Sequence, residues 1–140
     1  MKYRAGHVTN SSSSSFTVTV KYFPILGLEH QYPFIGNIIK SVEKFLTESK
    51  WVTRVATKKT LDAYLIKSLG CSKSEIKELV EDYGMEEEYE QYLDTILAGK
   101  ETIYFFSLSS EDESDAKIGT LLSLLKSESW IKVDGEYNDF

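Results

Sequence analysis

Side chains that could bind an anion gather near the amino terminus. Arg4, His7 and Asn10 precede five consecutive serines at residues 11–15. Serine hydroxyls donate and accept hydrogen bonds, and the cation would attract a phosphate, although the spacing of a P-loop is missing. One hypothesis is therefore a nucleotide- or phosphate-binding enzyme domain, and the alternative is a solvated leader. The candidate ligand-binding residues are Arg4, His7, Asn10, Ser11, Ser12 and Ser13.

The same segment resembles the start of a known group of proteins. Its pattern Arg-x-Gly-x-Val-Thr-Asn, at residues 4–10, leads through the serines directly into Phe16. This start resembles one that small uncharacterised bacterial and bacteriophage proteins share, and the similarity covers residues 2–16 only. The resemblance implies a bacterial or phage source. It implies no activity and no catalytic residue.

Two acidic segments in the second half of the chain could contact another protein. One lies at residues 111–115 after an apolar run, and the other lies at residues 86–90 between and around tyrosines. Aromatic side chains within a polar rim are typical of protein interfaces. The alternative is that the carboxylates only stabilise the positive amino-terminal ends of two helices. The candidate protein-binding residues are Tyr83, Glu86, Glu87, Glu88, Tyr89, Glu90, Glu111, Asp112 and Glu113.

Patterns for catalysis and for metal binding are scarce. The chain has two histidines, His7 and His30, and one cysteine, Cys71. The motifs of serine hydrolases, zinc proteases and dinucleotide-binding folds are absent, and residues 111–115 lack the spacing of an EF-hand. We therefore expect no catalytic residue, no metal and no cofactor. A single cysteine forms no internal disulfide, which indicates a reducing compartment and a cytoplasmic protein.

A basic stretch at residues 50–59 supports a further hypothesis. It combines Trp51 with four cations, enough for weak contacts to single-stranded nucleic acid through stacking and charge. The net charge of −6 opposes such binding, and the acidic segment at residues 74–82 opposes a DNA-reading helix. Nucleic acid is therefore a disfavoured partner. The four cations are Lys50, Arg54, Lys58 and Lys59.

Length and composition predict a single domain. The chain has 140 residues, of which 41% are hydrophobic, enough for a core without disulfides. We expect one domain over residues 1–140, with a serine-rich leader at residues 1–14. No secretory signal is visible. The longest apolar stretch, residues 30–39, is far shorter than the roughly 20 residues of a membrane-spanning helix, so no membrane partner is expected.

Charge is distributed unevenly along the chain. Residues 1–70 carry ten Lys or Arg and four Asp or Glu, a balance of +6. Residues 71–140 carry six and eighteen, a balance of −12. If the two halves form separate surfaces, the molecule has two faces of opposite potential.

Hydrophobic periodicity predicts the elements of the first half. Residues 15–22 alternate as a strand with one buried face. A helix is expected over residues 34–49, where apolar residues recur at helical spacing. A short strand or an extended link is expected over residues 51–56. The buried face of the first strand is expected to carry Phe16, Val18, Val20 and Tyr22.

Three helices and two strands are expected in the second half. The first helix ends near Gly70, the second begins at a capping box at residues 72–75 and ends near Gly84, and the third spans about 85–98. Residues 102–108 are apolar on both faces, which predicts a central strand. An acidic loop at 109–115, a final helix and a strand at 130–133 follow, so residues 102–133 have the length of a βαβ unit. The residues that form the apolar stripes of the three helices are Leu61, Tyr64, Leu65, Leu69, Ile76, Leu79, Val80, Tyr83, Met85, Tyr89, Tyr92, Leu93, Ile96 and Leu97, and the final helix is marked by Ile118, Leu121, Leu122, Leu124 and Leu125.

Together these patterns predict an α+β domain, or a three-layer α/β domain, with three or four strands and about five helices. As function we expect a non-enzymatic protein-binding accessory factor of bacterial or phage origin. Its acidic surface would dock on a basic surface of a larger protein. A phage source would make it a host-directed inhibitor or an antidefence protein. The oligomeric state is not predicted.

Overall fold

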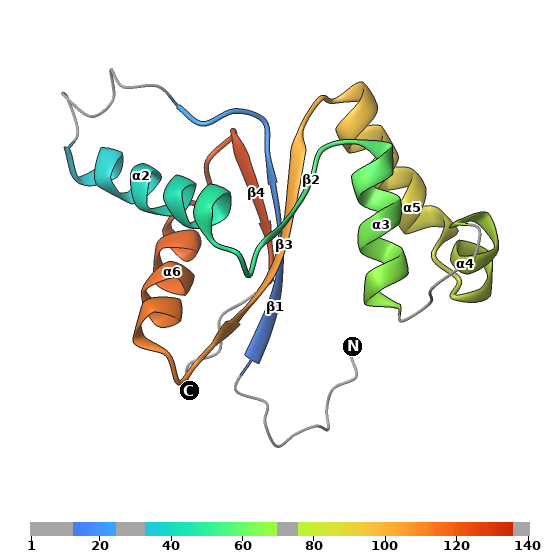
Figure 1. The fold of residues 1–140 in the computed structure, drawn as a ribbon. Helices are drawn as coiled ribbons and strands as arrows, with labels where there is room; N and C mark the ends of the chain where they lie inside the picture. The colour runs from blue at the N-terminus through green and yellow to red at the C-terminus, as the bar shows by residue number, and fades with distance from the viewer. Residues whose placement is uncertain (1–12, 25–32, 70–75, 136–140) are drawn as a thin grey trace.

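An antiparallel sheet lies between two layers of helices (Figure 1). The structure is a computed structural model, and it describes residues 13–24, 33–69 and 76–135. In the described residues the sheet has four strands in the order β2-β3-β1-β4, and every neighbouring pair is antiparallel. This confirms the α+β class. The strands are β1 (Ser13–Val20), β2 (Thr53–Val55), β3 (Thr102–Ser109) and β4 (Ile131–Asp134).

The helices divide between the two faces of the sheet. One face is covered by two helices, and the other by two helices and a π-helical turn, with a further short helix packed on those two away from the sheet (Figure 1). The first layer holds α2 (Pro33–Glu48) and α6 (Glu113–Leu124), and the second holds α3 (Lys58–Ser68), α4 (Ile76–Asp82), α5 (Glu86–Leu93) and η2 (Asp94–Ala98).

Alternation along β1 directs its apolar side chains toward the first helix layer. Phe16, Val18 and Val20 are buried, as predicted from the period of two. The strand begins at Ser13, so two residues of the predicted leader belong to the sheet. The prediction for Tyr22 was wrong, because the strand ends at Val20 and leaves the Tyr22 side chain 59% exposed.

Strand β3 is central and contributes to both cores, as its apolar sequence predicted. Its residues Tyr104, Phe106 and Leu108 face the first helix layer. There the Phe106 ring stacks on Phe16 at 5.4 Å between centroids and meets the edge of Phe45 at 5.1 Å. The other buried members of this first core are Val18, Val20, Ile38, Ile39, Val42, Leu46, Leu122, Leu125, Trp130 and Ile131.

The second core lies on the opposite face of the sheet. The Phe105 ring stacks on Tyr64 of α3 at 4.1 Å and meets Tyr92 of α5 edge-on at 5.6 Å. The predicted leucine stripe of α3 is confirmed, since Leu61 and Leu65 are buried here. The remaining buried members are Val55, Ile96 and Ile103.

Burial of Tyr92 gives the second core a dependence on pH. Burial, followed by the nearby Glu88 carboxylate, raises the pKa of the Tyr92 hydroxyl, so folding favours its neutral form. Its contribution to stability is therefore complete below about pH 10, the pKa of an unfolded tyrosine, and is lost as pH rises through the higher folded pKa. We expect Tyr92→Phe to show a smaller alkaline loss of unfolding free energy than the wild type. Urea unfolding at neutral and alkaline pH measures this, and equal losses in the two proteins would contradict it.

Predictions for the ends of the helices were less accurate. The expected single helix at residues 85–98 is α-helical only to Leu93 and continues as the π-helical turn, in which the Gly99 N–H bonds to the Asp94 carbonyl at 3.0 Å. This wider turn changes the direction of its side chains, so Ile96 is buried while Leu97 is 56% exposed rather than inward. In the last turn of α6, which the sequence predicted as the final helix, Leu124 is exposed.

The turn after α4 explains another wrong prediction. Helix α4 ends at Asp82, and Gly84 adopts the left-handed conformation with φ of 64° that ends a helix. Tyr83 therefore lies in the turn and is 52% exposed rather than facing the core. The predicted capping box at residues 72–75 and the stop at Gly70 lie outside the described residues.

The expected βαβ unit at residues 102–133 is present in an altered form. Strands β3 and β4 are both antiparallel to β1, so they run in the same direction. They are not neighbours, because β1 lies between them. The buried face of β1 supplies apolar side chains to the first core, which is consistent with its place between β3 and β4.

Candidate functional site

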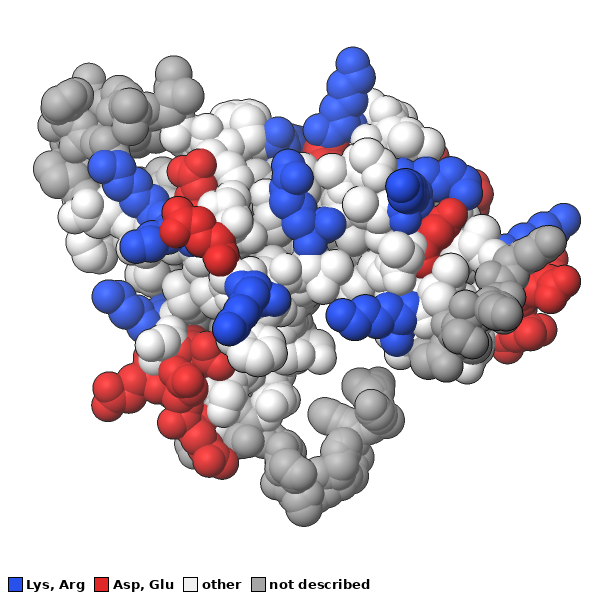
Figure 2. Space-filling view, in the orientation of Figure 1, with Lys and Arg blue, Asp and Glu red and all other residues white. Residues whose placement is uncertain are grey.

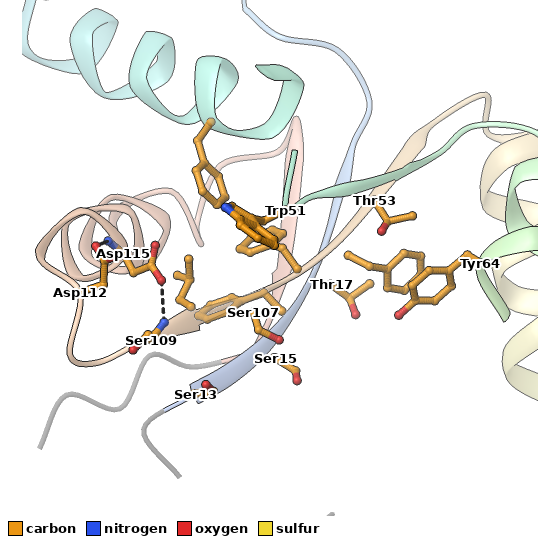
Figure 3. A pocket seen from close by; sticks show the side chains of 15 residues that line it. Ser13, Ser15, Thr17, Trp51, Thr53, Tyr64, Ser107, Ser109, Asp112 and Asp115 are labelled. Atoms are coloured by element: carbon orange, nitrogen blue, oxygen red, sulfur yellow. Dashed lines mark hydrogen bonds between the residues drawn. The ribbon is translucent and has the colours of Figure 1, made fainter. Parts of the chain in front are cut away.

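A groove of about 650 Å³ lies at the end of the sheet where β2 begins, beside Thr53 (Figure 3). It follows β3 from Phe105 to Ser109 and opens on both faces of the sheet. Three kinds of side chain line it. They are the hydroxyls of Ser13, Ser15, Thr17, Thr53, Ser107 and Ser109, the aromatic rings of Phe16, Phe45, Trp51, Tyr64, Phe105 and Phe106, and the carboxylates of Asp112 and Asp115, together with Leu108.

The groove exists because β2 is much shorter than its neighbour. Strand β1 pairs with β3 along residues 102–109, whereas β2 pairs only with residues 103–105. The chain that precedes β2 turns away, since the Val52 N–H bonds to the Ser49 carbonyl at 3.3 Å. Among the described residues, the second half of β3 therefore has a strand on one side only.

At this end of the sheet only β1 and β3 are paired, and the outer edge of β1 is partly covered. Gly135 follows β4 and lies directly against the Ser15 carbonyl of β1, where an added Cβ would come within 2.6 Å of the oxygen. Its φ of 127° is a conformation that favours glycine. Gly135 therefore covers the edge of β1 at Ser15, whereas the edge of β3 at Ser107 has no strand beside it among the described residues.

Trp51 is the most exposed large apolar side chain at the groove. It is 78% exposed, and it lies beside the carboxyl end of α2 above β3 (Figure 3). The Lys50 ammonium lies 5.7 Å from its ring centroid, a distance at which a cation is attracted to an indole face. The sequence indicated Trp51 only as part of a basic stretch, and the structure places it at the mouth of an aromatic and acidic groove.

Four serines from β1 and β3 form one face of the groove. Ser13 is the register partner of Ser109, and Ser15 is the partner of Ser107, so the four side chains share one face of the sheet. Among the described residues that line the groove there are two carboxylates and no lysine or arginine. This electrostatic environment suits a positively charged ligand better than a phosphate.

The acidic end of the groove is built by the start of α6. The Asp112 carboxylate caps this helix by accepting from the Ser114 and Asp115 N–H groups at 2.8 and 3.2 Å. Asp115 Oδ2 accepts the Ser109 N–H at 2.8 Å. Glu111 and Glu113 beside them are exposed. Asp112 therefore stabilises the amino-terminal end of a helix, as one of the two hypotheses for this segment stated. The segment as a whole also places negative charge at the groove.

The second acidic segment has a different environment. The Tyr89 hydroxyl donates to Asp62 Oδ1 at 2.7 Å, and the same carboxylate holds Lys58 at 2.8 Å. Tyr89 is thereby packed within the chain, and this burial raises the pKa of its hydroxyl. The Tyr83 hydroxyl lies 3.5 Å from the Leu69 carbonyl. Glu86, Glu87, Glu88 and Glu90 are all exposed on α5.

The two acidic segments do not form one surface. Helices α5 and α6 lie in opposite layers of the fold (Figure 1), and Figure 2 shows acidic side chains over both layers, interspersed with Lys and Arg. Both layers mix elements from the two halves of the chain, because α2 pairs with α6 and α3 packs against α5. The sequence asymmetry in charge therefore does not become two faces of opposite potential.

Several candidate residues cannot be placed. Arg4, His7, Asn10, Ser11 and Ser12 lie outside the described residues, as do His30 and Cys71. Within the described ranges, no three side chains of His, Cys, Asp or Glu are grouped to hold a metal ion. No helix in that part of the chain is long and apolar enough to cross a membrane.

Comparison of the chain with protein-family models, with curated proteins and with solved structures found no match. The resemblance of residues 2–16 to bacterial and phage proteins stays a prediction. The observations that bear on function are thus the α+β fold and the groove at the open edge of β3.

Proposed function

We propose that the protein is a non-enzymatic protein-binding accessory factor that recognises a basic partner through the groove. The observation that carries this proposal is the 78% exposure of Trp51 at the mouth of a groove with carboxylates at one end. The resemblance of residues 2–16 supports a bacterial or phage source. With a phage source, the protein acts as a host-directed inhibitor or an antidefence protein.

An exposed tryptophan is the kind of residue that dominates binding energy at protein interfaces. Tryptophan supplies a large rigid surface, and truncating such an anchor commonly costs 2 kcal/mol or more, about a thirtyfold loss of affinity. Phe45 of α2 also lines the groove. The polar rim is supplied by the serines and by Asp112 and Asp115.

The enzymatic alternative receives less support from this geometry. A phosphate bound next to Ser13 would lie in a groove whose described charges are the carboxylates of Asp112 and Asp115. Like charges repel, so the carboxylates would weaken the binding of an anion there. The proposed ligand is therefore a cationic protein surface and not a nucleotide.

Trp51→Ala is expected to weaken capture of the partner about thirtyfold. Tagged wild-type and variant proteins are used to capture proteins from bacterial lysate, and affinity for the captured partner is then measured by titration. Phe34→Ala is the matched control, because Phe34 is 73% exposed on α2 and does not line the groove. Equal affinities of wild type and Trp51→Ala would contradict the proposal.

Two further arms of this experiment separate the alternatives. Charge reversal of Glu111 and Glu113 is expected to weaken capture, whereas reversal of Glu86 and Glu87 on the opposite layer is expected to leave it unchanged. If reversal of Glu86 and Glu87 weakened capture and reversal of Glu111 and Glu113 did not, the interface would lie on α5. Treatment with nuclease identifies capture through nucleic acid, which would assign Trp51 and Lys50 to base stacking.

A further inference from the structure

We propose that the groove binds an extended, basic segment of the partner as an additional strand beside β3, opposite Ser107. This inference rests on the proposed protein-binding function and specifies how the partner is held. In this mode the backbone of the incoming segment bonds to a free sheet edge, and alternate side chains enter pockets on the two faces.

The hydrogen bonds of β3 show which backbone groups face the open edge. In an antiparallel pair, successive residues point their N–H and C=O groups alternately toward one neighbour and the other. The Ser109 N–H bonds to Asp115 and not to Ser13, its partner in the register. Phe105, four residues earlier, is the last residue of β3 that pairs with β2. By the same alternation, the N–H and C=O of Ser107 point away from β1.

Nothing in the described part of the chain occupies the position opposite Ser107. If β2 continued in register, residue 51 would lie there, but the chain turns at Ser49 before that pairing forms. Proteins usually protect such an edge with a proline, a bulge, an inward charge or a covering loop. Here Asp115 satisfies the last outward N–H, at Ser109. The preceding position, Ser107, is left available for an added strand.

The two sides of the groove predict the sequence pattern of the segment. On the α2 side, an added strand meets the aromatic rings of Phe45 and Trp51. On the other side, it meets the hydroxyls of Ser15 and Ser107 (Figure 3). Because side chains alternate along a strand, residues of the partner should alternate between apolar and small polar types.

Charge complementarity selects a basic segment. Asp112 and Asp115 lie at the end of the groove next to Ser109, and exposed Glu111 and Glu113 extend the negative charge. Among the described residues no lysine or arginine lines the groove, and the Lys50 ammonium lies beside Trp51 at its mouth. A lysine or arginine at the corresponding end of the added strand would bring opposite charges together and would also fix its direction.

The test uses a display library of random ten-residue peptides selected on the full-length protein. We expect enriched peptides to alternate between apolar and small polar residues and to carry lysine or arginine near one end. A selected peptide is then titrated against Ser107→Pro, which removes the outward N–H, and against Ser107→Thr, which keeps it. Proline is tolerated on a strand edge whose N–H makes no ladder bond. Leu108→Pro removes an N–H directed to β1 and is expected to unfold the protein.

Ser107→Pro is expected to bind the peptide at least about tenfold more weakly than the wild type, since the hydrogen bond from the Ser107 N–H is lost and the proline ring crowds the incoming strand. Ser107→Thr should bind within about threefold of the wild type. In the unaltered protein, amide hydrogen exchange at Ser107 should slow when the peptide binds. This last measurement decides the question even if Ser107→Pro does not fold.

The outcomes distinguish the mode of binding from the function. If Ser107→Pro binds normally and exchange at Ser107 is unchanged, while Trp51→Ala still weakens binding, strand addition is wrong and the protein-binding groove stands. If Trp51→Ala also has no effect, the proposed function fails as well. Enrichment of acidic peptides, or of none, overturns the basic segment. A dimer that forms without peptide and is lost in Ser107→Pro would assign the edge to a second copy.

Discussion

Phe106→Ala is expected to lower the free energy of unfolding by about 3–5 kcal/mol. Phe106 is buried in the first core, where its ring stacks on Phe16 and meets the edge of Phe45. Alanine would remove both ring contacts and would leave a cavity between β3 and α2. Neighbouring side chains close such a cavity only in part, so the loss includes both burial and packing.

The comparison with Phe34→Ala isolates this effect of burial. Phe34 undergoes the same chemical change on α2, but its side chain is 73% exposed. Its substitution is expected to change the unfolding free energy by no more than about 0.5 kcal/mol. Urea unfolding followed by far-ultraviolet circular dichroism measures both variants. A loss below 1 kcal/mol in Phe106→Ala would show that this ring is not a central part of the core.

The elements that could be predicted from sequence are those whose burial follows a regular period. The alternation of Phe16, Val18 and Val20 gave the buried face of β1 correctly, and the unbroken apolar run gave β3 as a strand buried on both faces. These patterns succeed because a residue's neighbours along the chain report on the face it occupies. Tyr22 and Leu97 continue such patterns beyond the point where the backbone changes, and there the prediction was wrong.

The order of the strands depends on contacts that no local pattern contains. Residues 102–133 have the length of a βαβ unit, and β1 enters between its two strands from a distant part of the sequence. The same interleaving places α2 beside α6. Because each helix layer contains elements from both halves of the chain, the net charge of one half does not predict the net charge of one surface.

The candidate site illustrates the same limit. Trp51, Ser13 and Asp112 each stood out in the sequence, but as members of three separate hypotheses. They meet in one groove because β2 has only three residues and leaves the second half of β3 with a strand on one side only. The length of β2 depends on where the chain turns before it, which composition and periodicity do not specify. Ser107 carried no sequence signal, since its importance lies in its backbone.

Leu61→Ala tests whether the two cores form one cooperative unit. Leu61 is fully buried in the second core, and its truncation is expected to cost about 2–5 kcal/mol. Phe105 and Phe106 are adjacent in β3 and belong to different cores. Loss of the second core would therefore remove the support of the strand that completes the first. We expect both cores to unfold together.

The tryptophans allow each core to be observed separately. Trp130 is buried in the first core, so its fluorescence reports on that core in a Trp51→Phe background. Circular dichroism reports on the helices of both layers. Leu61→Ala should lower the urea midpoint equally by the two measurements, because a two-state transition gives the same midpoint with any probe. If the midpoint from Trp130 stayed at its wild-type value while the midpoint from circular dichroism fell, the second helix layer would unfold independently, and the expected single domain would be wrong.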